Sequence, residues 1–244
     1  MARHCRAVCE KGGAGDCGVH HVNDIELVCF DMAGTTMTDN GLVLEAFRRT
    51  TESLMVVGDD ARAAETYVVE TMGRSKIEVF TALFGERALS ANELFEHYFV
   101  EAAQELGVSE IPGTRSTVET LRGRGRGVAL TTGFSPATRE ALVDVLGWAD
   151  LFDLRVSPVD AGRGRPAPDM LLWCALRARV TAMGAVMAVG DTASDMQAGV
   201  RAGVGYCVGV RSGTDDEQRL VANGADDVID TVVDLLSYES LTSR

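Results

Sequence analysis

The sequence predicts an α/β fold: a doubly wound parallel sheet with a helical domain inserted after its first strand. Two observations lead to this fold class. From residue 109 onward, short apolar runs alternate with segments of helical length, a pattern typical of a parallel sheet with helices on both faces. Between the first apolar run and this region, residues 41–108 show helical periodicity instead. Ligands of such sheets bind beyond the carboxyl ends of the strands, so the inserted helices would cover that edge.

The first strand is expected over Ile25–Phe30, a mostly apolar run that stops at Asp31. The inserted helices follow from apolar residues at helical spacing, namely Leu44, Phe47, Thr51 and Leu54, and later Leu94, Tyr98, Ala102 and Leu106. After Pro112-Gly113, helices are expected over Ser116–Arg122, Pro136–Leu146, Pro168–Ala178 and Ser194–Ala202. Strands are expected over Gly127–Leu130, Leu154–Val156, Ala185–Val189, Gly205–Val210 and Asp227–Ile229.

These elements divide the chain into three parts. Residues 24–40 and 109–244 are expected to form the α/β core, and residues 41–108 a helical cap domain. Residues 1–23 are rich in Gly, Cys and His and show no periodicity, so we expect a flexible N-terminal extension. Its Cys5, Cys9, Cys17, His20 and His21 match no zinc-binding spacing.

Composition excludes several classes of function. The formal net charge of −13 argues against a nucleic-acid partner, since binding to a phosphate backbone needs a basic face. No apolar run approaches the ~18 residues of a membrane span. The first residues lack the apolar core of a secretory signal, so a cytoplasmic location is expected. Cys29 and Cys207 fall within expected strands and are interpreted as reduced structural thiols.

Four short polar segments fall where expected strands end. They are DMAGTT (Asp31–Thr36), LTTG (Leu130–Gly133), RGRP (Arg163–Pro166) and GDTASD (Gly190–Asp195). Each alone has a purely structural explanation; an aspartate after a strand, for example, often caps a helix. In this order, and at one predicted edge of one sheet, they indicate a shared site.

The aspartates of these segments suit phosphoryl transfer. Asp31 supplies a carboxylate that can attack phosphorus and form an aspartyl-phosphate. Asp191 and Asp195 offer the hard oxygen ligands that Mg²⁺ prefers, and the metal would bring an anionic phosphoryl group to an anionic nucleophile. Gly34 and Gly190 permit the tight turns that such an edge needs.

The other two segments supply groups for phosphoryl oxygens. Thr132 offers a hydroxyl group and Gly133 permits close approach, although the neighbouring Thr131 is an alternative to Thr132. Arg165 supplies a fixed positive charge in a forked geometry, and Arg163 is the alternative.

From about residue 25 to the C-terminus, this order of motifs resembles the haloacid dehalogenase superfamily. Most phosphatases of that superfamily carry a second aspartate two residues after the nucleophile, which protonates the leaving oxygen. Here Ala33 occupies that position. Without this acid, cleavage of a phosphate ester should be poorly assisted, by ~10²-fold or more. The resemblance therefore implies a leaving group that does not need that proton.

The segment MGRSKIEVF (Met72–Phe80) resembles the Met-Gly-x-x-Lys segment of phosphonoacetaldehyde hydrolase, or phosphonatase. Lysine occurs in this chain only at Lys11 and Lys76. The combination of Ala33, Lys76 and Arg165 is specific to that family. The full set of matches is Asp31, Ala33, Gly34, Thr35, Met72, Gly73, Lys76, Arg165, Asp191, Thr192, Ser194 and Asp195.

The resemblance implies a mechanism. Neutral Lys76 would condense with a carbonyl group beta to phosphorus, and the protonated imine would let the C–P bond break toward an enamine. Asp31 would accept the phosphoryl group, and water would later release phosphate. The substrate would be a 2-oxoalkylphosphonate such as phosphonoacetaldehyde. Burial or neighbouring positive charge would have to lower the pKa of Lys76.

The resemblance also implies further site residues and an assembly. Substrate contacts are expected from Gly34, Thr35, Met72, Gly133 and Arg163. The backbone carbonyl of Ala33 would join Asp31, Asp191 and Asp195 around Mg²⁺. The cap would be of the C1 type, and a homodimer with contacts through the cap is expected.

The chain departs from the phosphonatase pattern at a few positions. Phe134 stands where the family has a tyrosine, Val79 where it has a histidine, and AGRGRP carries an extra Gly-Arg. These changes bear on phosphonoacetaldehyde as the substrate rather than on the type of reaction, and other 2-oxoalkylphosphonates are alternatives.

Two other functions remain open from the sequence. One is a phosphomonoesterase that acts on a small metabolite without a Schiff base, and the other is a non-catalytic binding protein on the same fold. A phosphomutase is disfavoured, because its chemistry needs the acid that Ala33 replaces.

Overall fold

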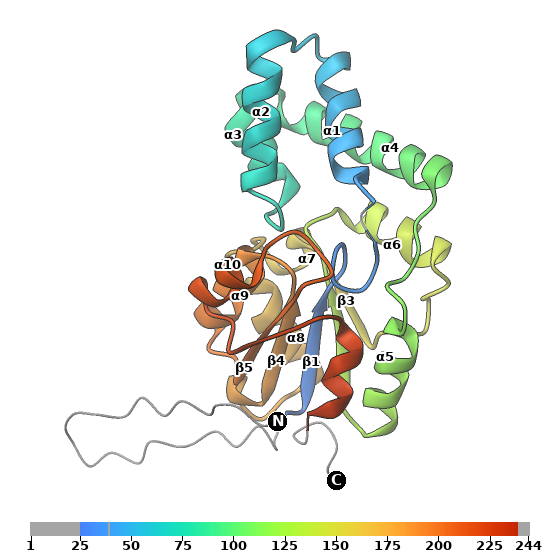
Figure 1. Cartoon of the computed structure of the whole chain (residues 1–244), viewed down its shortest axis with the longest axis vertical. Coiled ribbons are helices and arrows are strands. Elements are labelled where there is room, and N and C mark those ends of the chain that lie inside the picture. The colour runs from blue at the N-terminus through green and yellow to red at the C-terminus, as the bar shows by residue number, and fades with distance from the viewer. Residues whose placement is uncertain (1–24, 39, 239–244) are drawn as a thin grey trace, which may run out of the picture.

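In a computed structural model, which describes residues 25–38 and 40–238, six parallel strands form one sheet in the order β3-β2-β1-β4-β5-β6 (Figure 1). Strand β1 (Leu27–Asp31) lies at the centre, between β2 (Gly127–Thr131) and β4 (Val186–Gly190). The others are β3 (Leu154–Val156), β5 (Tyr206–Val210) and β6 (Asp227–Ile229). The strand order reverses beside β1, the position where such sheets bind ligands. The predicted fold class is confirmed.

Strand β1 is buried along its whole length, as a parallel strand covered on both faces must be. Its side chains alternate between two apolar clusters. Val28 and Phe30 belong to the larger cluster, whereas Leu27 and Cys29 belong to the smaller one. The apolar run in the sequence is therefore a consequence of two separate cores that meet at this strand.

Helices cover both faces of the sheet. The face that carries Leu27 and Cys29 packs against α8 (Asp169–Ala178) and α9 (Ala193–Ala202). The opposite face packs against α5 (Thr114–Gly123), α6 (Pro136–Val145) and the 3₁₀ helix η4 (Val232–Ser237). Each predicted core strand and helix is present, with ends that differ from the prediction by at most two residues.

Four short elements were not predicted. They are the helices α7 (Pro158–Ala161) and α10 (Glu217–Ala222) and the 3₁₀ helices η3 (Met183–Ala185) and η4. Each spans fewer than two α-helical turns, so its sequence is too short to show helical periodicity. Local signals nevertheless mark three starts: Ser157 forms a capping box at α7, Thr231 forms one at η4, and Asp216 caps α10.

Residues 42–106 form helices that lie above the carboxyl ends of the strands in Figure 1. They are α1 (Leu42–Ser53), α2 (Gly58–Glu70), α3 (Lys76–Phe84), the 3₁₀ helix η2 (Gly85–Arg87) and α4 (Ala88–Leu106). We call residues 41–108 the helical cap. Its interior is aromatic: the ring of Phe80 lies 6.2 Å from that of Phe47 and 5.3 Å from that of Phe95.

The two segments that join the cap to the sheet are paired with each other. Thr38 donates a backbone hydrogen bond of 2.9 Å to Ser109, and Ile111 donates one of 2.9 Å to Thr36. The cap therefore has two adjacent attachments to the core.

Residues 1–24, 39 and 239–244 lie outside the described part. The expected N-terminal extension and its Cys and His residues are among them, so those expectations remain untested. Across the described part, no helix combines the length and the apolar character that crossing a membrane requires.

Candidate active site

Three carboxylates meet at the carboxyl edge of the sheet. Asp31 ends β1, Asp191 directly follows β4, and Asp195 lies in the first turn of α9. Oxygen atoms of all three lie within 4.8 Å of one another, and the three residues are only 6%, 1% and 5% exposed. Because β1 and β4 are neighbours in the sheet, residues far apart in the sequence converge here.

This crowding changes the proton affinity of Asp191. Burial and the neighbouring Asp31 carboxylate raise the pKa of Asp191 to about 7. Two donors oppose the shift: the Thr214 amide lies 2.8 Å from one carboxylate oxygen, and the Thr35 hydroxyl lies 3.1 Å from the other. The cluster thus holds more negative charge than its surroundings stabilise.

Arg165 is the cation within this cluster. Its guanidinium pairs with Asp31 at 2.6 Å and also with Asp195, and the residue is 4% exposed. Arg163, the alternative in the sequence, has a side chain that is 68% exposed and pairs with Asp169 at 2.9 Å. Of the two arginines, Arg165 is therefore the one that faces the carboxylates.

The cluster fits a divalent cation. One guanidinium faces three buried carboxylates, and oxygen ligands at this spacing suit Mg²⁺. Asp195 is the most engaged of the three, because its carboxylate also accepts the Thr192 amide at 3.1 Å and the Thr192 hydroxyl. Ala33, whose carbonyl is expected to be a further ligand, lines the same pocket as Asp31 and Asp191.

The segment after β2 supplies neutral groups. The Thr131 hydroxyl donates to the Phe30 carbonyl at 3.1 Å and so faces back into the sheet. Thr132 lines the pocket, and its hydroxyl accepts the Phe134 amide at 3.3 Å. Of the two threonines, Thr132 is therefore the one that lines the pocket with Asp31 and Asp191.

The cap contributes one loop, Met72 to Lys76, which lies directly against the core. Gly73 has φ +79°, and a Cβ atom there would collide with Thr192. At Gly133 a Cβ atom would lie 2.8 Å from the Arg74 carbonyl oxygen. Both positions need glycine for the two parts to approach this closely. The Lys76 amide also donates to the Gly133 carbonyl at 3.4 Å.

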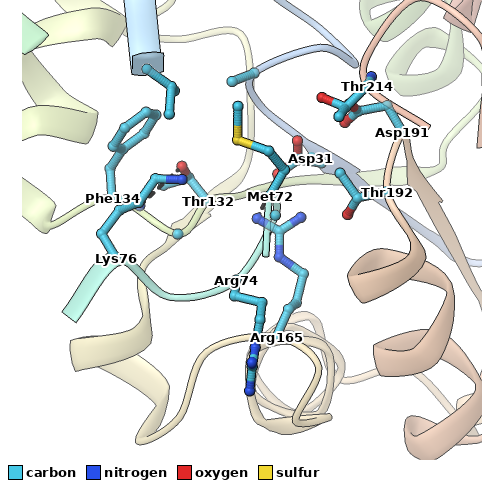
Figure 2. Close-up of a pocket in the computed structure, with 14 residues that line it drawn as sticks. Asp31, Met72, Arg74, Lys76, Thr132, Phe134, Arg165, Asp191, Thr192 and Thr214 are labelled. Carbon is cyan, nitrogen blue, oxygen red and sulfur yellow. Dashed lines mark hydrogen bonds and ion pairs between the residues drawn. The ribbon is translucent and has the colours of Figure 1, made fainter. Parts of the chain in front are cut away.

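Lys76 begins α3, is half-buried, and lines the same pocket as Asp31 (Figure 2). Its Nζ atom lies 5.7 Å from the centre of the Phe134 ring, within the range of a cation–π contact. Val79, one helical turn later, is 5% exposed and packs with Phe80 and Phe95 in the interior of the cap. The position of the family histidine thus lies behind Lys76 rather than in the pocket.

Eight predicted site residues line one pocket: Asp31, Ala33, Met72, Lys76, Thr132, Gly133, Arg165 and Asp191. Four others do not line it. Thr35 and Asp195 contact lining residues, Gly34 accepts a hydrogen bond of 2.7 Å from Ser212 through its carbonyl, and Arg163 lies on the surface.

Val43 and Thr214 also line the pocket and were not predicted. Val43 lies on α1, and its apolar side chain carries no chemical signal. Thr214 had a signal, because Arg211–Asp215 is a polar segment that follows strand β5.

Comparisons with known proteins agree with this geometry. The family model described as haloacid dehalogenase-like hydrolase matches residues 25–203. A phosphonoacetaldehyde hydrolase from Bacillus cereus (strain AH187) is 32% identical over 221 residues, which cover 79% of this chain and 78% of that protein. Another, from Bacteroides fragilis (strain YCH46), is 36% identical over 135 residues, covering 54% of this chain and 49% of that protein.

Among solved structures, a phosphonoacetaldehyde hydrolase-like protein from Oleispira antarctica superposes with a TM-score of 0.78 at 24% identity. The alignment covers 94% of this chain and 96% of that one, and it shows a shared fold. By its sequence, the chain belongs to the haloacid dehalogenase-like hydrolase family.

Proposed function

We propose that this member of the haloacid dehalogenase-like hydrolase family cleaves the carbon–phosphorus bond of a 2-oxoalkylphosphonate such as phosphonoacetaldehyde. The products are phosphate and an aldehyde or ketone. The observation that carries the proposal is that the Lys76 amine and the Asp31 carboxylate face one pocket while Ala33 stands at the position of the usual acid. Similarity to phosphonoacetaldehyde hydrolases over most of the chain supports it.

In the first stage, the neutral Lys76 amine attacks the substrate carbonyl carbon. Loss of water leaves a protonated imine, which the face of the Phe134 ring can stabilise as a cation. The positive nitrogen withdraws electrons from the carbon that bears phosphorus. This makes the C–P bond breakable without a proton donor at position 33.

In the second stage, a carboxylate oxygen of Asp31 attacks phosphorus. The electron pair of the C–P bond moves to carbon and forms an enamine on Lys76, and Asp31 becomes an aspartyl-phosphate. Water then attacks phosphorus and releases phosphate, while protonation and hydrolysis of the enamine free the carbonyl product and Lys76. Arg165 and Thr132 line the same pocket and would bind phosphoryl oxygens.

Asp31, Asp191, Asp195 and the Ala33 carbonyl would hold Mg²⁺. A bound Mg²⁺ supplies positive charge that lets an anionic nucleophile approach an anionic phosphonate. Met72 and Gly133 would contact the substrate from the two sides of the pocket.

Several wider features belong to the same proposal. We propose domain boundaries at residues 24–40 plus 109–244 for the core and 41–108 for the cap. A cytoplasmic location, a role in phosphonate metabolism and a homodimer through the cap are also proposed, on the resemblance to phosphonatases.

Trapping the imine tests this function. The protein is treated with Mg²⁺, phosphonoacetaldehyde and borohydride, and any added mass is located by peptide mapping. We expect a reduced adduct on Lys76 and none in the Lys76→Arg variant. If neither this aldehyde nor longer 2-oxoalkylphosphonates leave an adduct, the Schiff-base mechanism is wrong. Release of phosphate from esters would then favour the phosphomonoesterase, and no metal-dependent phosphate release at all would favour a binding protein.

A further inference from the structure

A carboxylate side chain of the helical cap forms hydrogen bonds with the amino end of a helix in the core. Glu96 lies on α4, and one of its carboxylate oxygens accepts the Ser135 amide at 3.1 Å. The other oxygen accepts the Thr138 hydroxyl at 2.9 Å and also the Ser135 hydroxyl. Ser135 is the N-cap residue of α6, the helix that lies beneath α4 in Figure 1. Glu96 thus binds the start of a helix that belongs to the other part of the molecule.

The Glu96 carboxylate is held by hydrogen bonds rather than by an ion pair. Among residues 25–38 and 40–238, the contacts of the Glu96 carboxylate are with amide and hydroxyl groups rather than with a basic side chain. Its charge instead faces the amino end of α6, where the helix dipole favours an anion. Glu96 accepts hydrogen bonds from three groups at the start of α6, and from the Asn92 amide of its own helix at 3.3 Å. Its contact with α6 is therefore geometrically specific rather than a diffuse attraction between charges.

The capped segment leads directly into the active site. Ser135 follows Phe134, whose ring lies 5.7 Å from the Lys76 amine and 4.5 Å from the Phe99 ring. Phe99 lies on α4, one helical turn after Glu96. Two residues before Ser135, the Gly133 carbonyl accepts the Lys76 amide. Helix α4 therefore contacts the segment beside Lys76 in two ways. Glu96 forms hydrogen bonds with Ser135, and the Phe99 ring packs against the Phe134 ring.

We propose that Glu96 is a positioning residue. Its hydrogen bonds to Ser135 and Thr138, which we call the latch, hold the cap at the start of α6 and thereby place Lys76 opposite Asp31. Without this latch, the cap would be held at the pocket by the Met72–Lys76 loop, by aromatic packing and by the hydrogen bond of 3.2 Å from the Arg219 guanidinium to the Glu70 carbonyl. Sub-ångström placement decides the rate of such reactions, and an error of about 1 Å can lower a rate ~10²-fold. The expected effect on catalysis rests on the proposed function, in which Lys76 forms the imine. The contact between Glu96 and α6 does not depend on that function.

The test compares Glu96→Gln with a matched control, Glu93→Gln, an exposed residue on the same helix. Thr138→Val is a second variant, which removes one of the three contacts while keeping the shape of a buried side chain. Amide hydrogen exchange over residues 72–76 reports closure of the loop without any substrate. We expect exchange there to be ~10-fold faster or more in Glu96→Gln, and faster in Thr138→Val, with Glu93→Gln unchanged.

Kinetics supply the second readout. We expect kcat to fall ~10-fold to 10²-fold in Glu96→Gln with a smaller change in KM, together with slower borohydride trapping on Lys76. The double variant with Thr138→Val should be little slower than Glu96→Gln alone, because both act on one contact.

The outcomes separate the latch from the proposed function. Equal exchange over residues 72–76 in wild type, Glu96→Gln and Thr138→Val would overturn the latch, whatever happens to activity or thermal stability. If exchange rises as expected but the wild-type protein neither forms the Lys76 adduct nor releases phosphate from phosphonates, the latch stands and the proposed function fails.

Discussion

The core and the cap contribute opposite kinds of chemistry to the same pocket. The core supplies buried charge: Asp31, Asp191 and Arg165 lie at the edge of the sheet. The cap supplies an amine, Lys76, within largely apolar surroundings. The charged edge suits the transfer of any phosphoryl group to an aspartate. Lys76 of the cap would then decide whether a C–P bond or a phosphate ester bond is cleaved.

The two parts also differ in how their residues are held. Asp31 ends a strand that pairs along its length with two neighbours, so its position follows from the sheet itself. Lys76 is positioned across the pocket by a loop, an aromatic contact and the proposed Glu96 latch. Changes to the core should therefore affect every substrate, and changes to the cap should alter substrate choice.

The largest effect is expected from Asp31→Asn. An amide is a poor nucleophile toward phosphorus, so phosphate release from every substrate should fall ~10⁴-fold or more. Phosphate release is the measurement, and borohydride trapping on Lys76 is the control. Because imine formation does not use Asp31, the adduct should still form. Loss of the adduct would show that the two parts do not act in separate steps.

Lys76→Arg should separate the two parts most clearly. A guanidinium keeps the charge but cannot form the imine, so phosphonate cleavage should fall ~10³-fold or more. Any slow hydrolysis of a phosphate ester should stay within ~3-fold of the wild-type rate, since it needs only the core. Steady-state assays with both substrates measure this ratio. Equal retention of both activities would assign all of the chemistry to the core.

Arg165→Met tests whether the positive charge of Arg165 stabilises the buried carboxylates of the core. It leaves the buried carboxylates of Asp31 and Asp195 without their partner. Removing one partner of a buried ion pair typically lowers the free energy of unfolding by about 3–5 kcal/mol. Urea unfolding in the absence of divalent cations measures the loss, and Arg163→Met, on the surface, is the control. Added Mg²⁺ should restore part of the stability of Arg165→Met; equal stability of the two variants would contradict this stabilisation.

Asp191 should make the stability of the protein depend on pH. Its pKa in the folded protein is about 7, well above the ordinary value. Its contribution to stability without metal is therefore present below the ordinary pKa and is lost as the pH rises through about 7.

Mg²⁺ must displace this proton, so its apparent affinity should be roughly 30-fold weaker at pH 5.5 than at pH 8. Titration of the thermal midpoint with Mg²⁺ measures the affinity, and Asp191→Asn should bind weakly at both pH values. An affinity in the wild type that does not change with pH would remove Asp191 from the metal site.

The smallest effect is expected from Phe134→Tyr, which changes the contact between the two parts. The family tyrosine would place a hydroxyl group on the buried ring that faces Lys76. We expect the ratio of kcat/KM for phosphonoacetaldehyde to that for a 2-oxoalkylphosphonate with a larger alkyl group to rise by less than ~10-fold. A ratio that does not move would show that the ring acts on Lys76 rather than on the substrate.

The sequence by itself determined the sheet and the place of its chemistry. The runs Leu154–Val156 and Asp227–Ile229 were predicted with the bounds that the structure has. The apolar runs of β1 and β4 are buried along their whole length, as strands covered on both faces are, and the hydrophobicity that predicts this is a property of each segment itself. All strands are parallel, so the polar segments that directly follow β1, β2 and β4 had to meet at one edge. The prediction that Arg163–Pro166 also follows a strand was wrong, because α7 lies between β3 and this segment.

Only the tertiary structure decided which neighbour of a pair faces the pocket. Arg165 rather than Arg163, and Thr132 rather than Thr131, face the carboxylates, because the side-chain direction beyond a strand end depends on the local path of the chain. The contact of Glu96 with Ser135 likewise joins segments from two parts of the molecule. Such contacts follow from the packing of whole elements, which leaves no periodic signal in either segment.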